Sequence, residues 1–88
     1  MDHAVEIKDY AFSPERLSIK QGDGVKWRNA DSVRHSARRD QNPAFNTGFI
    51  APGGESAVVR FDQVSSEQGY DYFCEMHPAM TGIIVVTT

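Results

Sequence analysis

The sequence predicts an all-β protein, a small antiparallel β-sandwich, and three observations support this prediction. Short segments alternate apolar and polar residues, as strands with one buried and one exposed face do. Gly, Pro, Asn and Asp separate these segments, and no stretch combines helical periodicity with capping residues. At 88 residues the chain is long enough for one small hydrophobic core, so we expect residues 1–88 to form a single domain.

The alternating segments follow one another along the whole chain. A glycine-rich turn at residues 21–24 separates the second segment from the third. The stretch from Arg38 to Gly54 holds two prolines and three glycines and shows no strand pattern, so we expect it to cross between the two sheets as a loop. The segments expected to form strands are residues 5–8, 17–20, 25–28, 57–61, 70–74 and 83–87.

Composition and charge exclude several classes of function. Nine basic and twelve acidic side chains give a formal net charge of -3, which disfavours a nucleic-acid binder that relies on phosphate neutralisation. No apolar run approaches the roughly 20 residues of a membrane-spanning helix. The start of the chain lacks the basic and apolar segments of a signal peptide, so we interpret the sequence as a mature or excised domain.

The only cysteine, Cys74, lies in a segment that also contains His77 and Met80. A thiolate, an imidazole and a thioether within seven residues are three of the four ligands of a trigonal electron-transfer copper site. The missing ligand is a second histidine, and His35 is the best candidate. A redox dithiol or a dinuclear copper centre needs a second cysteine, and a structural zinc site uses four Cys or His ligands; neither pattern is present.

The strand pattern explains how Cys74 reaches such a site. Tyr70, Tyr72 and Cys74 alternate along the strand expected at 70–74, so all three point towards the core. The strand places Cys74 at one end of the sandwich, and the turn that follows brings His77 and Met80 back towards it. We expect the next strand to begin after Gly82.

These residues resemble the cupredoxin family, and most of all its small amicyanin and plastocyanin-type members. The most specific feature is the spacing of Cys74, His77 and Met80, which is the short ligand loop typical of amicyanins. The resemblance implies a Greek-key β-sandwich with one copper ion at one end. It also implies the four copper ligands, which are His35, Cys74, His77 and Met80. The matching segments are 12–14, 17–19, 22–27, Asn29 and Asp31 ahead of His35, 69–72 and 74–82.

Three residues depart from the usual pattern of the family. Arg34 and Ser36 flank His35 where many relatives have proline and asparagine, and Met76 replaces a proline in the ligand loop. We expect the Ser36 hydroxyl to tie the His35 segment to the ligand loop. We also hypothesise that the backbone N–H groups of Met76 and Ser36 donate to the Cys74 sulfur and raise the reduction potential. Met76 is a weaker candidate than Met80 for the axial ligand.

Other conspicuous residues have simpler interpretations. Trp27 alternates with Val25 and is expected in the core, and the terminal His3 is expected to be solvated. Phe73 flanks Cys74 on the opposite face of its strand and is interpreted as an aromatic packed under a loop, with a second electron route as the alternative. The cluster of Arg34, Arg38 and Arg39 near the metal end would steer an acidic redox partner if these charges are free.

The sequence therefore predicts a mononuclear copper protein that carries one electron between redox partners and is not an enzyme. By resemblance, its partners would dock transiently near His77, which Pro52, Met76, Pro78 and Ala79 would surround with apolar surface. We expect a monomer outside the cytoplasm, in the periplasm or an equivalent compartment. Two alternatives stay open: a copper carrier or storage protein, and a cupredoxin module excised from a larger copper oxidase or reductase.

Overall fold

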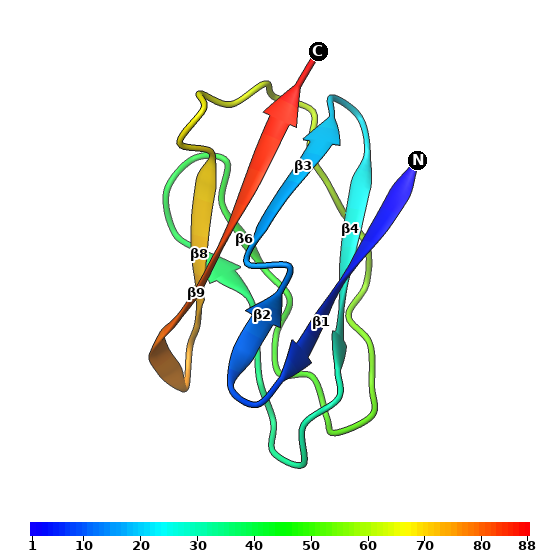
Figure 1. Cartoon of the computed structure of the whole chain (residues 1–88), viewed down its shortest axis with the longest axis vertical. Helices are drawn as coiled ribbons and strands as arrows, with labels where there is room; N and C mark the ends of the chain where they lie inside the picture. The colour runs from blue at the N-terminus through cyan, green and yellow to red at the C-terminus, as the bar shows by residue number, and fades with distance from the viewer.

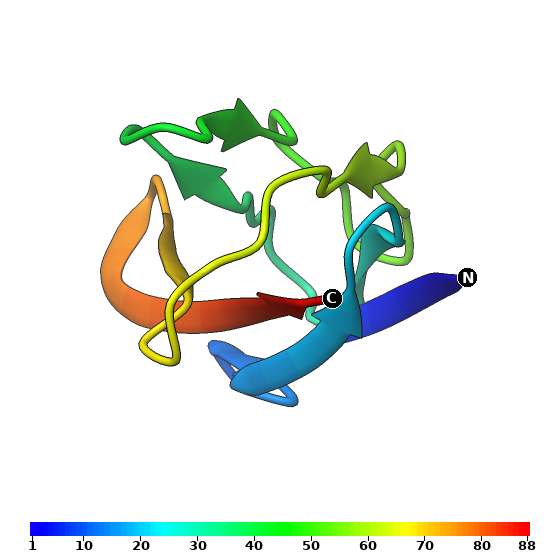
Figure 2. The ribbon, with the colours of Figure 1, turned by 90° about the horizontal axis from the view of Figure 1, so that it is seen from above.

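A computed structural model describes all residues from 1 to 88, and its nine strands form two sheets packed face to face (Figure 1 and Figure 2). The predicted all-β fold is confirmed. One sheet has the order β2-β1-β4-β7 and the other has the order β3-β9-β8-β5-β6. The strands are β1 (Asp2–Lys8), β2 (Ala11–Ser13), β3 (Arg16–Lys20), β4 (Gly24–Asn29), β5 (Arg38–Arg39), β6 (Phe45–Asn46), β7 (Val59–Arg60), β8 (Tyr70–Cys74) and β9 (His77–Thr87).

The chain changes sheets several times, and this produces parallel pairs that the sequence did not predict. β1 pairs with β4 in parallel, and β3 pairs with β9 in parallel, whereas the remaining neighbours are antiparallel. A parallel pair requires a crossover connection. Between β1 and β4 the crossover consists of β2 and β3, since β2 belongs to the first sheet and β3 to the second. The sandwich is therefore mixed rather than wholly antiparallel.

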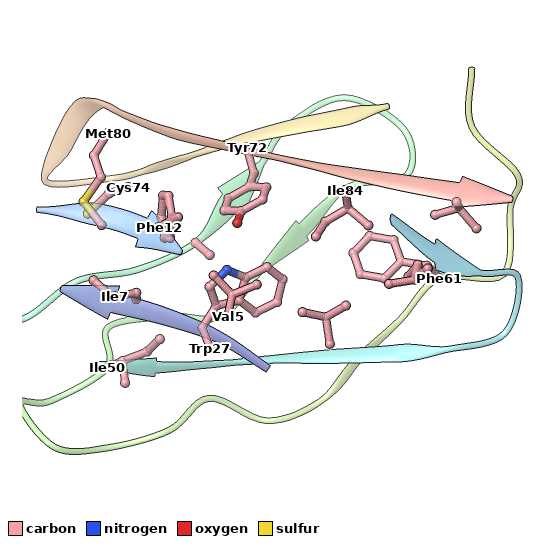
Figure 3. Close-up of a cluster of buried hydrophobic side chains, with 14 residues drawn as sticks. Val5, Ile7, Phe12, Trp27, Ile50, Phe61, Tyr72, Cys74, Met80 and Ile84 are labelled. Atoms are coloured by element: carbon pink, nitrogen blue, oxygen red, sulfur yellow. The ribbon is translucent and has the colours of Figure 1, made fainter. Parts of the chain in front are cut away.

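The core fills the space between the two sheets with alternate residues of each strand (Figure 3). Val5 and Ile7 of β1 and Trp27 of β4 are fully buried on one side, and they face Tyr72 of β8 and Ile84 of β9. The period-two pattern of the sequence thus identified the buried faces correctly. Cys74 and Met80 belong to the same cluster and lie at one end of it.

The boundaries of three regions differ from the sequence prediction. β9 begins at His77 instead of after Gly82, so Cys74 and His77 are paired across a two-residue turn. Gly82 is needed for another reason: a Cβ atom there would lie 2.4 Å from the Tyr72 ring. The segment 38–54 holds the two short strands β5 and β6, and the strand expected at 57–61 is reduced to Val59–Arg60.

The structure contains no helix long and apolar enough to cross a membrane.

Candidate metal centre

Three predicted ligands from distant parts of the chain converge at one end of the sandwich. The sulfur of Cys74 lies 3.6 Å from Nδ1 of His35 and 3.7 Å from Nδ1 of His77. The donor atoms of these three residues all lie within 4.8 Å of one another. Cys74 and His35 are fully buried, while His77 is partly exposed. The site therefore has a buried interior and one histidine at its rim.

Met80 lies at the same end of the core as these residues. It is only 6% exposed and belongs to the same buried cluster as Cys74. Figure 3 shows the side chains of Met80 and Cys74 at the same end of the core. The rival thioether, Met76, is 44% exposed, so the burial of the two methionines favours Met80 as a ligand.

A tight hairpin brings Cys74 and His77 together. The two residues are a cross-strand pair of β8 and β9, with only Glu75 and Met76 between them. The backbone N–H of Glu75 donates to Oγ of Ser36 over 2.9 Å. The predicted role of the Ser36 hydroxyl is thus confirmed, because this bond fixes the hairpin to the segment that carries His35.

The predicted hydrogen bonds from backbone N–H groups to the Cys74 sulfur are absent. Neither the N–H of Met76 nor that of Ser36 donates to it; its polar neighbours are the two histidine Nδ1 atoms. The turn directs the Met76 side chain to solvent, and the short hairpin leaves the Ser36 hydroxyl, not its amide, in contact with the loop. The sequence hypothesis for Met76 and Ser36 is wrong in this structure.

The segment that carries His35 is held by backbone and amide hydrogen bonds. His35 and Ile50 form an isolated antiparallel bridge, with N···O distances of 3.3 and 2.7 Å. The buried Asn29 at the end of β4 donates from Nδ2 to the carbonyls of Val33 and Ile50 and accepts from the N–H of Asp31. These hydrogen bonds hold the backbone on both sides of His35 in place.

Asp31 orients the imidazole of His35, and sequence reasoning did not assign it this role. Its Oδ2 lies 2.8 Å from Nε2 of His35. An ionised carboxylate only accepts hydrogen bonds, so Nε2 carries the proton and the lone pair of Nδ1 faces Cys74. Burial raises the pKa of Asp31, but hydrogen bonds from the N–H groups of Tyr10 and Asp9 and from His35 lower it by more. Asp31 is therefore ionised at neutral pH.

Tyr10 covers the two histidines from outside. Its ring meets the His35 ring edge-on with centroids 5.2 Å apart, and the His77 ring edge-on with centroids 4.8 Å apart. Tyr10 as a whole residue is 52% exposed. No signal in the sequence identifies this contact, because Tyr10 lies in the turn between β1 and β2, far along the chain from both histidines.

The predicted basic rim is largely neutralised by ion pairs. Arg38 binds Asp40 at 2.6 Å and Glu75 at 2.8 Å. Arg39 is nearly buried and binds Asp71 at 2.6 Å. These two arginines are therefore not free to steer a partner, and the prediction is wrong for them. Arg34 stands apart, because its guanidinium lies over the ring of Phe49 at 4.9 Å from the centroid.

Three further residues complete the comparison with the sequence. Trp27 is fully buried, as predicted. Phe73 is partly buried and lines an open groove with Arg39, Asp71, Pro78 and Thr81. His3 is not simply solvated, because its Nε2 lies 2.9 Å from Oδ2 of Asp23.

The comparison with protein families decides which family has this site. The model of the "Copper binding proteins, plastocyanin/azurin family" matches residues 1–87. The chain belongs to this family. Among curated proteins it is similar to amicyanin-alpha of Methylorubrum extorquens, with 28% identity over 93% of this chain and 69% of the relative. It is also similar to amicyanin of Paracoccus versutus, with 30% identity over 93% of this chain and 62% of the relative.

Solved structures agree on the fold. The crystal structure of amicyanin from Paracoccus versutus matches with a TM-score of 0.82 and 28% identity, covering 94% of this chain and 78% of that one. A copper-containing nitrite reductase from Thermus scotoductus matches with a TM-score of 0.87 and 28% identity. This match covers all of the present chain but only 23% of the reductase. The chain thus corresponds to most of a small copper protein or to a small part of a large one.

The donor set fits the metal that the family binds. Electron-transfer copper sites combine one soft thiolate with two imidazoles and a weak axial thioether. The cluster of Cys74, His35 and His77 supplies the first three, and Met80 belongs to the same buried cluster as Cys74. The carboxylate of Asp31 behind His35 is the kind of outer partner that fixes a metal-binding imidazole. The residues of this site therefore suit one copper ion.

Proposed function

We propose that this chain is a type 1 copper protein that carries one electron at a time between redox partners. Its copper ligands are His35, Cys74, His77 and Met80, and residues 1–88 form one domain. The observation that carries the proposal is the position of the Cys74 sulfur, 3.6 Å from Nδ1 of His35 and 3.7 Å from Nδ1 of His77.

The protein residues hold the donors in place so that little has to move during electron exchange. Bound copper supplies a Cu(I)/Cu(II) couple that gains or loses one electron. The bridge from His35 to Ile50 and the bond from Glu75 to Ser36 fix the two ligand segments. Four ligands leave no position for a substrate, whereas catalysis usually needs an open position. A carrier is therefore the better match to this site than an enzyme.

Electrons enter and leave at the edge of His77 in this proposal. His77 is the one histidine ligand that is partly exposed, while Met76, Pro78 and Ala79 beside it are exposed. A small apolar surface of this kind suits brief contact, because redox interfaces are small and weak. The protein acts as a monomer outside the cytoplasm, as the resemblance to amicyanins and plastocyanins implies.

Copper addition with matched methionine variants tests the ligand set. We expect Cu(II) to produce the intense visible absorption of a copper–thiolate bond, and Cys74→Ser to abolish it. Met80→Leu should keep the colour but raise the reduction potential, because a weak donor to Cu(II) is lost. Met76→Leu is the control and should leave the potential unchanged. A colourless wild-type protein, or a larger shift in Met76→Leu than in Met80→Leu, contradicts the assignment.

A second function has a specific observation in its favour. The match to the nitrite reductase covers the whole chain, so the domain can also be an electron-transfer module of a larger copper enzyme. The mass of the native protein distinguishes the two. A product close to 9.8 kDa supports the free carrier, and a product several times larger supports the module.

Copper transport or storage uses the same ligands for a different purpose. A reversible one-electron couple with slow loss of Cu(I) to a chelator supports electron transfer. Rapid loss of Cu(I) with no reversible couple supports delivery of the metal.

A further inference from the structure

We propose that Asp31 is a positioning residue that holds the His35 ring and the Tyr10 ring over the copper site with a single carboxylate. The proposal rests on the proposed function, since it concerns how this chain controls its copper ligands. It assigns a role to the turn between β1 and β2, which contributes no ligand. We call the set of Asp31, Asp9, Tyr10 and His35 the carboxylate clamp.

Both oxygens of Asp31 accept hydrogen bonds. Oδ1 accepts from the N–H of Asp9 at 2.6 Å, and Oδ2 accepts from the N–H of Tyr10 at 3.0 Å. Oδ2 also accepts from Nε2 of His35 at 2.8 Å. The carboxylate thus connects the β1–β2 turn to the metal end across more than twenty positions of sequence.

The turn between β1 and β2 needs this carboxylate. Asp9 and Tyr10 both adopt left-handed conformations, with φ of 54° and 58°. These conformations are costly for residues with a Cβ atom, and a bulky residue such as tyrosine is rare there. Successive N–H groups in such a turn form a small concave site for an anion. The Asp31 carboxylate occupies that site and so stabilises the strained turn.

The turn also sets the position of the Tyr10 ring. The left-handed conformation projects its ring over both histidines, edge-on to each of them. His35 is already fully buried, but His77 is only partly buried. The Tyr10 ring therefore restricts water and chelators from reaching the exposed ligand, while the Asp31 charge acts on the buried one.

Two effects on the metal follow from this arrangement. A carboxylate behind a ligating imidazole makes the imidazole a better donor and favours the more highly charged Cu(II). Loss of the charge should raise the reduction potential. Loss of the turn should uncover His77 and speed the exchange of copper. A residue that only supported the fold would change stability without moving the potential.

Two substitutions separate these effects. Asp31→Asn removes the charge but keeps an oxygen that can accept from His35, so it should mainly raise the potential. We expect a tenfold change in the Cu(II)-to-Cu(I) preference, which corresponds to about 59 mV for one electron. Asp31→Ala removes every bond of the clamp and should also release copper to a chelator about tenfold faster, because loss of the Tyr10 cover exposes His77.

The matched control is Asp62→Asn, which removes one negative charge at the opposite end of the molecule. Asp62 is exposed and follows Phe61, whose backbone N–H donates to the carbonyl of Asp23. Asp23 lies beside the start of β1, at the end of the molecule away from the metal site. The longest dimension is 36 Å, and charges screen over about 8–10 Å at moderate salt. Its potential should therefore stay at the wild-type value. Equal potentials in Asp31→Asn, Asp31→Ala and Asp62→Asn overturn the proposal.

The role of Tyr10 is tested by a double-mutant cycle on copper release. Tyr10→Ala should speed release, and Tyr10→Phe should not, because the ring provides the contact. In the Tyr10→Ala background, Asp31→Ala should add little further, since the ring it positions is already gone. Full additivity of the two substitutions contradicts the clamp.

The apoprotein provides a measurement that does not depend on copper. We expect Asp31→Ala to speed hydrogen exchange of the Asp9 and Tyr10 amides at least about tenfold and to abolish the ring contact between Tyr10 and His77 in proton NMR spectra. Unchanged exchange overturns the clamp even if copper binds. Conversely, a wild-type protein that shows the clamp but no copper–thiolate colour refutes the proposed function and not the clamp.

Discussion

Each end of this sandwich contains a histidine paired with an aspartate, yet the two pairs have different surroundings. At the metal end, Nε2 of His35 lies 2.8 Å from Asp31; at the opposite end, Nε2 of His3 lies 2.9 Å from Asp23. His35 is fully buried with its second nitrogen towards the Cys74 sulfur. The side chain of His3 is 24% exposed, and its second nitrogen has no neighbour of this kind.

The difference shows that a histidine–carboxylate pair is not in itself a functional signal. Asp23 also accepts from the N–H of Lys20 and pairs with the ammonium of Met1, so this pair connects the first strand to the β3–β4 turn. Asp31 performs the same kind of connection for the β1–β2 turn, but its histidine is also a candidate ligand. Burial and the partner of the second nitrogen distinguish the two pairs.

Replacing each histidine should give the largest contrast between the two ends. His35→Ala should weaken copper binding by more than about 100-fold and abolish the copper–thiolate absorption, because loss of an outer partner alone costs about 10–100-fold. His3→Ala should leave the visible spectrum and copper affinity unchanged. Copper titrations followed by absorption provide the measurement. Equal losses in the two variants would remove the distinction between the ends.

Acid should reveal the structural role of the far pair. The hydrogen bond from His3, followed by those from the N-terminal ammonium and the N–H of Lys20, holds the pKa of Asp23 well below its usual value. A carboxyl with a lowered folded-state pKa stabilises the fold above its unfolded pKa of about 3.9 and loses this contribution as the pH falls further. Asp23→Asn should therefore destabilise the apoprotein at neutral pH.

The same substitution should matter progressively less as the pH decreases from about 4 towards 2. Urea unfolding at several pH values measures the difference between wild type and variant. A difference that is independent of pH would show that the charge of Asp23 contributes nothing to stability. Asp62→Asn is the control for this experiment, because it also removes one carboxylate charge. His35→Ala is not suitable, since it removes none.

Two serines make the same kind of hydrogen bond at opposite ends of the sandwich. Oγ of Ser36 accepts from the N–H of Glu75 at the metal end, and Oγ of Ser65 accepts from the N–H of Val86 at the opposite end, both over 2.9 Å. Each alanine substitution should lower the free energy of unfolding by about 1–3 kcal/mol, since a partly buried amide loses its acceptor. Only Ser36→Ala should also change the visible spectrum. A spectral change in Ser65→Ala would contradict this separation.

The smallest expected effect concerns the arginines. Arg34→Glu should slow electron exchange with an acidic partner modestly and lower its dependence on salt, because Arg34 has no carboxylate partner. Arg38 already binds Asp40 and Glu75. Arg38→Gln breaks these ion pairs, so it should change the free energy of unfolding more than the rate of electron exchange. Stopped-flow measurements of electron exchange at low and high ionic strength compare the two variants with wild type. Identical salt dependence in wild type and Arg34→Glu would exclude steering.

How much could be predicted from the sequence depended on the range of the interactions involved. The alternation of Val25 with Trp27, and of Tyr72 with Cys74, predicted which faces are buried, because side chains of a strand alternate by geometry alone. The spacing of the ligand loop predicted the kind of metal. The confirmed bond of Ser36 to the loop followed from the family resemblance.

The errors concern ion pairs with distant residues and the direction of one backbone N–H within a turn. The ion pairs of Arg38 and Arg39 involve Glu75 and Asp71, more than thirty residues further along. The hydrogen bonds proposed for Met76 depended on the direction of one N–H in a turn, which changes when β9 begins at His77. None of these features has a local pattern that would indicate it.

The sequence by itself thus determined an all-β domain, its buried faces, a copper-type ligand loop and its family. Tertiary structure alone decided the parallel pairing of β1 with β4, the ion pairs of Arg38 with Glu75 and of Arg39 with Asp71, and the carboxylate clamp. The physical reason is that periodicity and ligand spacing are set over a few residues, whereas Asp31 meets Tyr10 and Arg39 meets Asp71 only after distant segments are packed together.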